Sequence, residues 1–136
     1  MLAVLKPGGI LVLEDGDLTT AMSQPPTAMN AFADLFGRLG PTRGLDYSMA
    51  KNLHRFVDAA GLSGPRVVDH QPTCVTHEHR QLLKWSVEEA GSAFVGASLI
   101  TEEQLANTLL EMQQAADTPD VTVVAPRMYL VSCVKG

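Results

Sequence analysis

The sequence of 136 residues predicts an α/β fold in a single domain with its own core, and one observation supports each part of this prediction. Strand-like and helix-like segments alternate in the order strand, two helices, strand, two helices and final strands, which is typical of α/β proteins. The apolar share of 46% is close to the average for soluble domains, and a chain of this length can bury a core. No repeat, low-complexity tract or linker divides the chain, so we expect a single domain over residues 1–136.

Charge and hydropathy exclude two classes of partner. Lysine and arginine number 10 against 15 acidic residues, a net charge of −5, so we expect no basic face for nucleic acid. No apolar run approaches the roughly 18 residues that a membrane span needs. The apolar start at residues 1–5 is too short for a signal peptide. We therefore expect a cytoplasmic protein in which Cys74 and Cys133 are reduced thiols.

The first strand is predicted at residues 10–13. A turn with the sequence Lys6-Pro7-Gly8-Gly9 precedes the apolar run Ile10-Leu11-Val12-Leu13. Because this run is apolar on both faces, we expect a central parallel strand that is covered on both sides. The acidic segment at residues 14–17 and the polar segment at residues 18–24 are expected to be loops.

Two helices and a second strand are expected next. An apolar stripe after Pro25-Pro26 predicts a helix that ends at Gly40-Pro41, and another helix begins near Ser48 and has Gly61 as its C′ residue. The stripes of these two helices are Met29, Phe32, Leu35, Phe36 and Leu39, and Met49, Leu53, Phe56, Val57 and Ala60. Residues 66–70 predict a strand, which residues 73–76 can extend.

The last part of the chain predicts two more helices and the final strands. The third helix begins at about Glu78, and Gly91 and Gly96 weaken its second half by up to about 1 kcal/mol each relative to alanine. A capping box, Thr101-Glu102-Glu103-Gln104, marks the start of the fourth. Their expected core faces are Leu82, Leu83, Trp85 and Val87, and Leu105, Leu109 and Met112. Strands follow at residues 121–124 and 128–134, with Pro126 between them.

The segment Leu5-Lys6-Pro7-Gly8-Gly9-Ile10-Leu11-Val12-Leu13-Glu14-Asp15 closely resembles part of the class I S-adenosylmethionine-dependent methyltransferases. In that family a helix ends in a Leu-Lys-Pro-Gly-Gly turn and enters the fifth strand, and the carboxylate-rich loop after this strand borders the active-site cleft. Three later parts of the chain also resemble the family. They are residues 44–62 (the helix before the sixth strand), Thr101-Glu102-Glu103 with Asp117-Thr118-Pro119-Asp120 (an inserted helical pair), and residues 128–134 (the antiparallel last strand).

The resemblance implies a partial Rossmann-like methyltransferase fold, the C-terminal and substrate-side half of the family domain. We expect a small mixed sheet of about three strands with helices packed on it, in which the last strand lies between the other two. Residues 10–14 are then an edge. The family holds its cofactor with four earlier strands and a glycine-rich loop, but Gly8-Gly9 precedes a strand and does not follow one. S-adenosylmethionine is therefore expected for the full family domain, and none for this chain alone.

Three carboxylates are the first candidate site residues. Glu14, Asp15 and Asp17 follow the carboxyl end of the first predicted strand, where open α/β sheets place ligands. By the resemblance, Asp15 is a candidate catalytic residue, and Glu14 and Asp17 are candidate substrate-binding residues. A carboxylate there can orient a substrate amine or hydroxyl, or accept its proton. The alternative is a solvated loop in which Asp17 caps a turn.

His77 is a second candidate catalytic residue, as a proton acceptor. The motif His77-Glu78-His79 lacks the spacing of zincins and offers too few ligands without Cys74, so we predict no metal site. The alternative is a solvated turn. A thiol nucleophile at Cys74 with His77 has no visible third group to orient it.

Phe32, Arg80 and Trp85 are the remaining candidate substrate-binding residues. The two aromatic side chains can line an apolar pocket, and Arg80 can bind an anion. The alternatives are a core position for Trp85 and an exposed position at a helix start for Arg80.

Two functions are compatible with these features. The first is the substrate-side half of a small-molecule methyltransferase, inactive alone. The second is a non-catalytic dimeric module that binds a small ligand or acts as a partner subunit. In either case the uncovered edge at residues 10–14 predicts self-association, most simply as a homodimer. A third possibility is that Met1 is an internal methionine of a longer reading frame.

Overall fold

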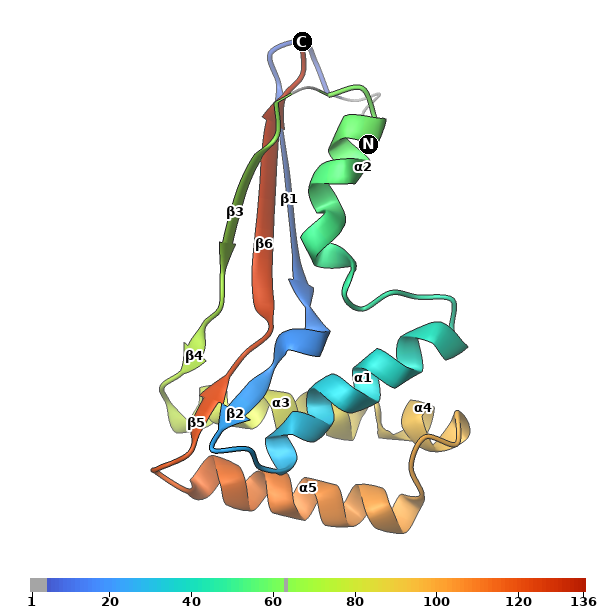
Figure 1. Ribbon diagram of the computed structural model, residues 1–136, viewed down its shortest axis with the longest axis vertical. Coiled ribbons are helices and arrows are strands. Elements are labelled where there is room, and N and C mark those ends of the chain that lie inside the picture. Colours follow the sequence, from blue (N-terminus) through green and yellow to red (C-terminus); the bar gives the residue numbers. More distant parts are fainter. Residues whose placement is uncertain (1–4, 63) are drawn as a thin grey trace.

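The computed structural model describes residues 5–62 and 64–136 (Figure 1). The strands are β1 (Ile10–Asp17), β2 (Met22–Gln24), β3 (Arg66–His70), β4 (Thr73–Cys74), β5 (Thr122–Val124) and β6 (Arg127–Val134). The α-helices are α1 (Ala31–Thr42), α2 (Leu53–Ala59), α3 (His77–Glu89), α4 (Gly91–Gly96) and α5 (Glu102–Asp117). Three 3₁₀-helices are η2 (Leu18–Thr20), η3 (Ala28–Asn30) and η4 (Met49–Asn52). The expected mixture of helices and strands is confirmed.

Strands β1, β6 and β3 form a sheet in that order, which we call sheet A. The C-terminal strand β6 is antiparallel to both neighbours, with Ile10 opposite Val134 on one side and Arg66 opposite Ser132 on the other. Strands β1 and β3 therefore run parallel to each other, one on each side of β6. The expected position of the last strand is confirmed, but the expectation of a mixed sheet is wrong, because each neighbouring pair is antiparallel.

The expected edge position of residues 10–14 is confirmed, because β1 is the terminal strand of sheet A. The expectation of a central strand covered on both sides is wrong, because only one face of β1 is covered. Side chains alternate between the two faces of a strand. Leu11 and Leu13 pack against the core, whereas Ile10 is 65% exposed and Val12 is 55% exposed. An apolar run does not show which of its faces a helix will cover, and here a helix covers one.

Helix α2 and the preceding η4 cover the inner face of sheet A. The buried residues there are Leu53, Val57, Leu62, Val131 and Cys133. Gly61 follows α2 with a φ of +76°, as predicted for a C′ glycine. Phe56 is 55% exposed, so its expected place in the buried stripe is wrong.

The second part of the molecule is a helical lobe, formed by α1, α3, α4, α5 and a small antiparallel sheet of order β2-β5-β4, sheet B. Its buried residues are Ala21, Met29, Phe32, Leu35, Phe36, Leu39, Cys74, Leu83, Val87, Phe94, Met112, Ala115, Ala116, Val121 and Val123. One loop expectation and one strand expectation are wrong here. Residues 18–24 form η2 and β2, and residues 73–74 pair with β5 and do not extend β3.

The helices of the lobe differ from the expectations at their ends and on one face. Helix α1 continues past Gly40-Pro41 to Thr42, and the third helix divides at Ala90 into α3 and α4. Leu82 and Trp85 lie on the exposed side of α3, at 49% and 47% exposure, so their expected core positions are wrong. The predicted capping box of α5 is confirmed. Thr101 Oγ1 accepts from Gln104 N at 3.1 Å, and Gln104 Oε1 accepts from Thr101 N at 3.0 Å.

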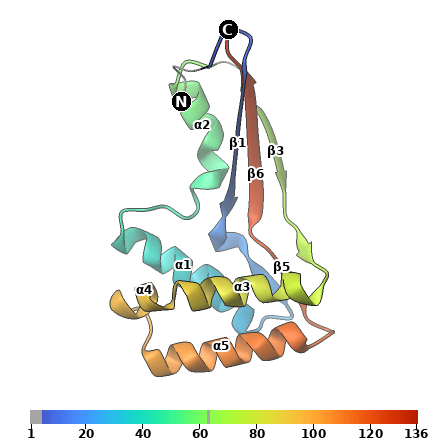
Figure 2. The ribbon, with the colours of Figure 1, turned by 180° about the vertical axis from the view of Figure 1, so that it is seen from behind.

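The helical lobe lies at one end of sheet A (Figure 1). Strands β1 and β3 run toward the lobe, and β6 runs away from it. Figure 2 shows the same arrangement from behind, with α3 and α5 beneath the ends of the strands. Among residues 5–62 and 64–136, no helix has the length and apolar character to cross a membrane.

Candidate functional site

The junction between sheet A and the helical lobe is the candidate functional site. It lies at the carboxyl ends of β1 and β3, the end at which open α/β sheets hold ligands (Figure 2). All three carboxylates singled out in the sequence lie on β1 and not in a loop after it, so the loop expectation is wrong. The strand is longer than its apolar run because β6 pairs with it as far as Asp17 opposite Arg127.

Asp17 is a structural residue. Its carboxylate is 3% exposed, and its Oδ1 accepts from Thr19 N at 3.0 Å and from Thr19 Oγ1 at 2.5 Å, which caps η2. Its Oδ2 lies 4.0 Å from Lys51 Nζ. Both oxygens of the carboxylate therefore have partners, and the alternative interpretation of Asp17 as a turn cap is confirmed. A substrate-binding role for Asp17 remains a prediction that its burial does not favour.

Asp15 and Glu14 lie on opposite faces of sheet A. Asp15 is exposed on the face that carries α2, opposite Tyr129, and Tyr129 lies in turn opposite Asp69 of β3. One row across the sheet therefore holds two carboxylates with a phenol between them. The Oδ1 of Asp15 accepts from Gly16 N at 2.8 Å and leaves Oδ2 for another donor. Glu14 points to the uncovered face, opposite Leu130, so the two acids do not act on one ligand.

A polar network that the sequence did not reveal joins sheet A to the lobe. Arg127 donates from Nη1 to Asp69 Oδ2 at 2.6 Å and from Nη2 to Gln71 Oε1 at 3.1 Å. Gln71 donates from Nε2 to Thr20 O at 2.8 Å and to Ala125 O at 3.2 Å. The partners are more than 50 residues apart in the chain, so spacing alone contains no signal for them. The network holds the carboxyl end of β3 against the turns that lead into sheet B.

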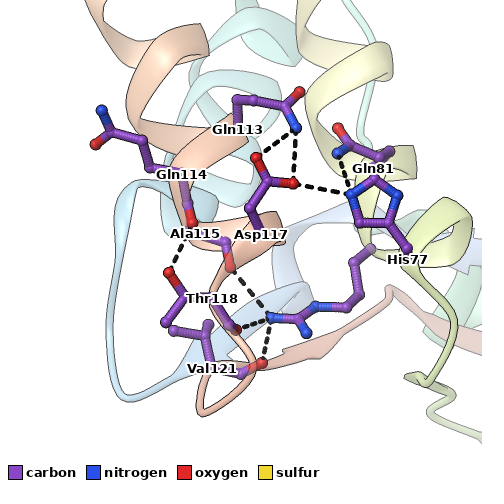
Figure 3. Close-up of polar contacts among 9 residues, drawn as sticks. His77, Gln81, Gln113, Gln114, Ala115, Asp117, Thr118 and Val121 are labelled. Atoms are coloured by element: carbon purple, nitrogen blue, oxygen red, sulfur yellow. Dashed lines mark hydrogen bonds and ion pairs between the residues drawn. The ribbon is translucent and has the colours of Figure 1, made fainter.

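His77 and Arg80 lie in the first turn of α3 and contact the end of α5, and Figure 3 shows His77 facing Asp117 there. His77 Nε2 lies 2.8 Å from Asp117 Oδ1, and Gln113 Nε2 donates to both oxygens of that carboxylate at 3.0 and 3.1 Å. The hydrogen bond from His77, followed by the one from Gln113, holds the pKa of Asp117 below its usual range. The contact is exposed, and it joins the ends of two helices.

Arg80 caps the C-terminal end of α5. Its Nη2 donates to the carbonyls of Ala115 at 3.1 Å and Val121 at 2.8 Å, and also to the carbonyl of Thr118 (Figure 3). The last carbonyls of a helix have no partner within the helix, and a cation is favourable there. Arg80 is thus half-buried, and its guanidinium is bound to backbone carbonyls. Neither the expected anion-binding role nor the expected exposed position at a helix start describes it.

Of the two aromatic candidates, Phe32 lies in the core, as its helix stripe predicted, and Trp85 does not, so the core alternative for Trp85 is wrong. Phe32 is 3% exposed in the core of the lobe and lies 4.7 Å from Phe36 between ring centroids, whereas Trp85 is half exposed on the outer side of α3. Periodicity places Trp85 on a helix but does not show which side of α3 packs against α1 and α5. Phe32 therefore contributes to packing, and Trp85 remains a candidate only for contacts at the surface.

Metal and thiol chemistry find no support in the described part of the chain. No three His, Cys, Asp or Glu residues among residues 5–62 and 64–136 gather as a metal site. Cys74 and Cys133 are both unpaired and buried. Burial raises the pKa of the Cys74 thiol, with an opposing effect from Arg80, and a protonated thiol is a poor nucleophile.

No glycine-rich loop follows a strand among the described residues. The glycines with positive φ are Gly8, Gly44, Gly61 and Gly64, which precede β1 or follow helices. None of them forms a loop after a strand, where a cofactor of this type is cradled. The segment after β1 is instead the η2 turn, whose capping carboxylate from Asp17 is already occupied.

A groove lies within the helical lobe, and none of its lining residues belongs to sheet A. It has a volume of about 430 Å³ and lies between α1 and α5, with Leu35, Leu99 and Ile100 along its apolar part. Asp34 and Arg38 border it and form an ion pair at 3.1 Å. The groove is large enough for a small molecule.

A scan of protein-family models found no match to this chain, and a search of curated proteins found none with significant similarity.

Proposed function

We propose that the chain is the substrate-side part of a small-molecule S-adenosylmethionine-dependent methyltransferase, and that it does not bind the cofactor by itself. The observation that carries the proposal is the strand order β1-β6-β3. A C-terminal strand that inserts antiparallel between two mutually parallel strands agrees with what the resemblance of residues 5–15 leads us to expect. The helical lobe at the carboxyl ends of β1 and β3 agrees with a substrate-binding role.

Asp15 is the residue to which we assign contact with the substrate. It is exposed on β1, it lies beside Tyr129, and one of its carboxylate oxygens has no protein partner among the described residues. A carboxylate in this position can hold an amine or hydroxyl and orient it. Since the described residues include no glycine-rich loop after a strand for the methyl donor, the contribution we assign to them is orientation of the acceptor. His77, which is bound to Asp117, is assigned no step.

Titration calorimetry with S-adenosylmethionine tests the cofactor half of this proposal. We expect no binding heat for the chain alone, and micromolar affinity would overturn the proposal. The gene sequence upstream of the Met1 codon tests the methyltransferase half. An in-frame segment that encodes a strand, a glycine-rich loop and a helix is the expected result. Its absence would contradict a methyltransferase and favour the second function.

The second candidate function is a ligand-binding module without catalysis. The groove of about 430 Å³ between α1 and α5 is the observation that favours it. Native mass spectrometry of the purified chain discriminates the two functions, because a binding module is expected to retain a small ligand of defined mass. A chain that carries no such ligand, and whose gene encodes the glycine-rich segment, would exclude the module.

A further inference from the structure

We propose that two copies of this chain pair through their β1 edges, antiparallel and about a two-fold axis, to give one continuous sheet of order β3-β6-β1-β1-β6-β3. The inference concerns the chain of 136 residues by itself and goes beyond both candidate functions. It is compatible with the second function and competes with the first, because an upstream strand of a longer methyltransferase would pair with the same edge. The inference specifies the surface through which the chain associates with itself and the register of the two strands. It also specifies the charges that favour a second copy of the chain at the β1 edge.

Strand β1 has an unpaired edge. In the described residues, β6 is its neighbour on one side and no strand pairs with it on the other. Gly9 O accepts from Lys135 N at 2.8 Å, which sets the phase of the β1–β6 ladder. Because the bonding direction alternates along an antiparallel strand, the N–H and C=O groups of Ile10, Val12 and Glu14 point away from β6. Such a row is a template for another strand.

The side chains at this edge do not protect it. Natural edge strands carry charges, prolines or bulges that block pairing. Residues 10–13 carry none of these, and Ile10 and Val12 are more than half exposed. On the other face, Leu11 and Leu13 pack against the buried cluster beneath α2. A paired strand flanks both sets of side chains, and on the face of Leu11 and Leu13 the apolar surface continues across the axis.

The charges at the two ends of β1 have opposite sign. Lys6 is exposed in the turn that precedes β1, and Lys135, whose Nζ donates to Leu5 O, lies beside Gly9 at the same end. Glu14 and Asp15 are exposed at the other end. Antiparallel pairing of two β1 strands places each acidic end beside the basic end of the partner, and it does so twice. This self-complementarity is why we commit to a second copy of the chain.

The charges also select the register. With Glu14 on the two-fold axis, the two Glu14 carboxylates face each other, which is destabilising. With Val12 on the axis, the two Glu14 side chains are four residues apart along the strand, about 14 Å at the usual rise. This separation exceeds the Debye length of about 8 Å at physiological ionic strength. We therefore place Val12 opposite Val12 and Leu11 opposite Leu13 of the second copy.

A disulfide test distinguishes this register from non-specific association. In the proposed pair, the two Val12 Cα atoms lie close enough for a disulfide, which needs less than about 7 Å. The matched control is Val68→Cys, on the outer strand β3 and also exposed. Its twin lies five strand spacings away, about 24 Å. The native thiols Cys74 and Cys133 are buried and do not compete.

Under mild oxidation at micromolar concentration, Val12→Cys is expected to form a covalent dimer on a non-reducing gel, and Val68→Cys is not. Equal cross-linking of both variants, or none in Val12→Cys, would overturn the proposal. The same holds if light scattering shows the parent chain to be a monomer at the highest soluble concentration.

Charge reversal provides a second test that does not depend on cysteine. Lys6→Glu and Glu14→Lys are each expected to weaken the dimer about threefold to tenfold at low salt, the range for exposed ion pairs that occur twice. The double variant restores the sign pattern and is expected to recover the parent dissociation constant in sedimentation equilibrium. A double variant that is weaker than either single variant would refute the charge argument. Lys6 lies in an exposed turn, so Lys6→Glu should fold normally.

Discussion

Replacing Arg80 with alanine tests how the helical lobe is held together. The Nη2 of Arg80 donates toward three backbone carbonyls at the end of α5, those of Ala115, Thr118 and Val121. One guanidinium nitrogen has two hydrogens, so we count two full hydrogen bonds. A hydrogen bond from a charged donor contributes about 1.5 kcal/mol or more, and the cation at a helix C-terminus adds up to about 1 kcal/mol.

An opposing term lowers this figure. The Nε of Arg80 is buried without a partner, and an unsatisfied buried donor costs about 1–3 kcal/mol. We therefore expect Arg80→Ala to lower the free energy of unfolding by about 2 kcal/mol. With a urea m-value of about 2 kcal/mol/M, the midpoint shifts by about 1 M.

The assay is urea unfolding followed by circular dichroism, with Arg38→Ala as the matched control. Arg38 also pairs with a neighbouring helix residue, Asp34, and donates to a carbonyl, that of Leu99, but it is exposed. Its loss should cost less than about 1 kcal/mol. Arg80→Lys keeps the charge without the planar guanidinium, so its loss of unfolding free energy should lie between those of Arg80→Ala and Arg38→Ala. The reasoning is refuted if Arg80→Ala is no more destabilising than Arg38→Ala.

Three further predictions concern other positions. Asp17→Ala should lower stability by about 1–2 kcal/mol, because it removes the cap of η2, while Asp17→Asn should retain most of that stability in urea unfolding. Gly40→Ala should lower the melting temperature measurably, because a Cβ would lie 2.6 Å from Leu45 O, which is backbone. The hydrogen bond from His77 lowers the pKa of Asp117, so its contribution to stability is present above the ordinary aspartate pKa and is lost as pH falls through the lowered value. Melting curves recorded between neutral and strongly acidic pH should show this loss, and Asp117→Asn should reduce it.

Each of these predictions has a clear counter-result. Equal stability of Asp17→Ala and Asp17→Asn would mean that the cap does not matter. For Gly40, Gly37→Ala is the control, because a Cβ there meets a neighbour at an ordinary 3.6 Å, and equal effects of both variants would contradict the clash argument. A melting curve for Asp117→Asn that follows the parent at every acidic pH would show that the contact with His77 has no influence on stability.

Signals that lie within a few residues of the chain predicted local structure well. The capping box at Thr101 and Gln104, the C′ glycine Gly61 and the break at Pro126 are all confirmed. Each depends on hydrogen bonds or dihedral angles of the residue itself and its near neighbours. The physical cause and the sequence signal therefore coincide.

Burial on one side of an element could not be predicted in the same way. Trp85 and Phe32 both lie on helices, but α1 and α5 meet only one side of α3, and Trp85 is on the other. The apolar run at residues 10–13 also did not show that one of its faces stays uncovered. Burial depends on which partner packs against a face, and that partner comes from a distant part of the chain.

The contacts of the candidate site show the same difference between local and long-range signals. The capping alternative for Asp17 was available because its partner Thr19 is two residues away. The contact of Arg127 with Asp69 joins residues 58 positions apart and is created by the alignment of β3 with β6. The sequence pattern determined the α/β class and most element positions, and the family resemblance implied the central place of the last strand. Only the tertiary structure decided that one face of β1 stays uncovered, that Arg80 caps α5, and that Asp15 rather than Asp17 is open to a ligand, because these properties arise from contacts between segments far apart in the chain.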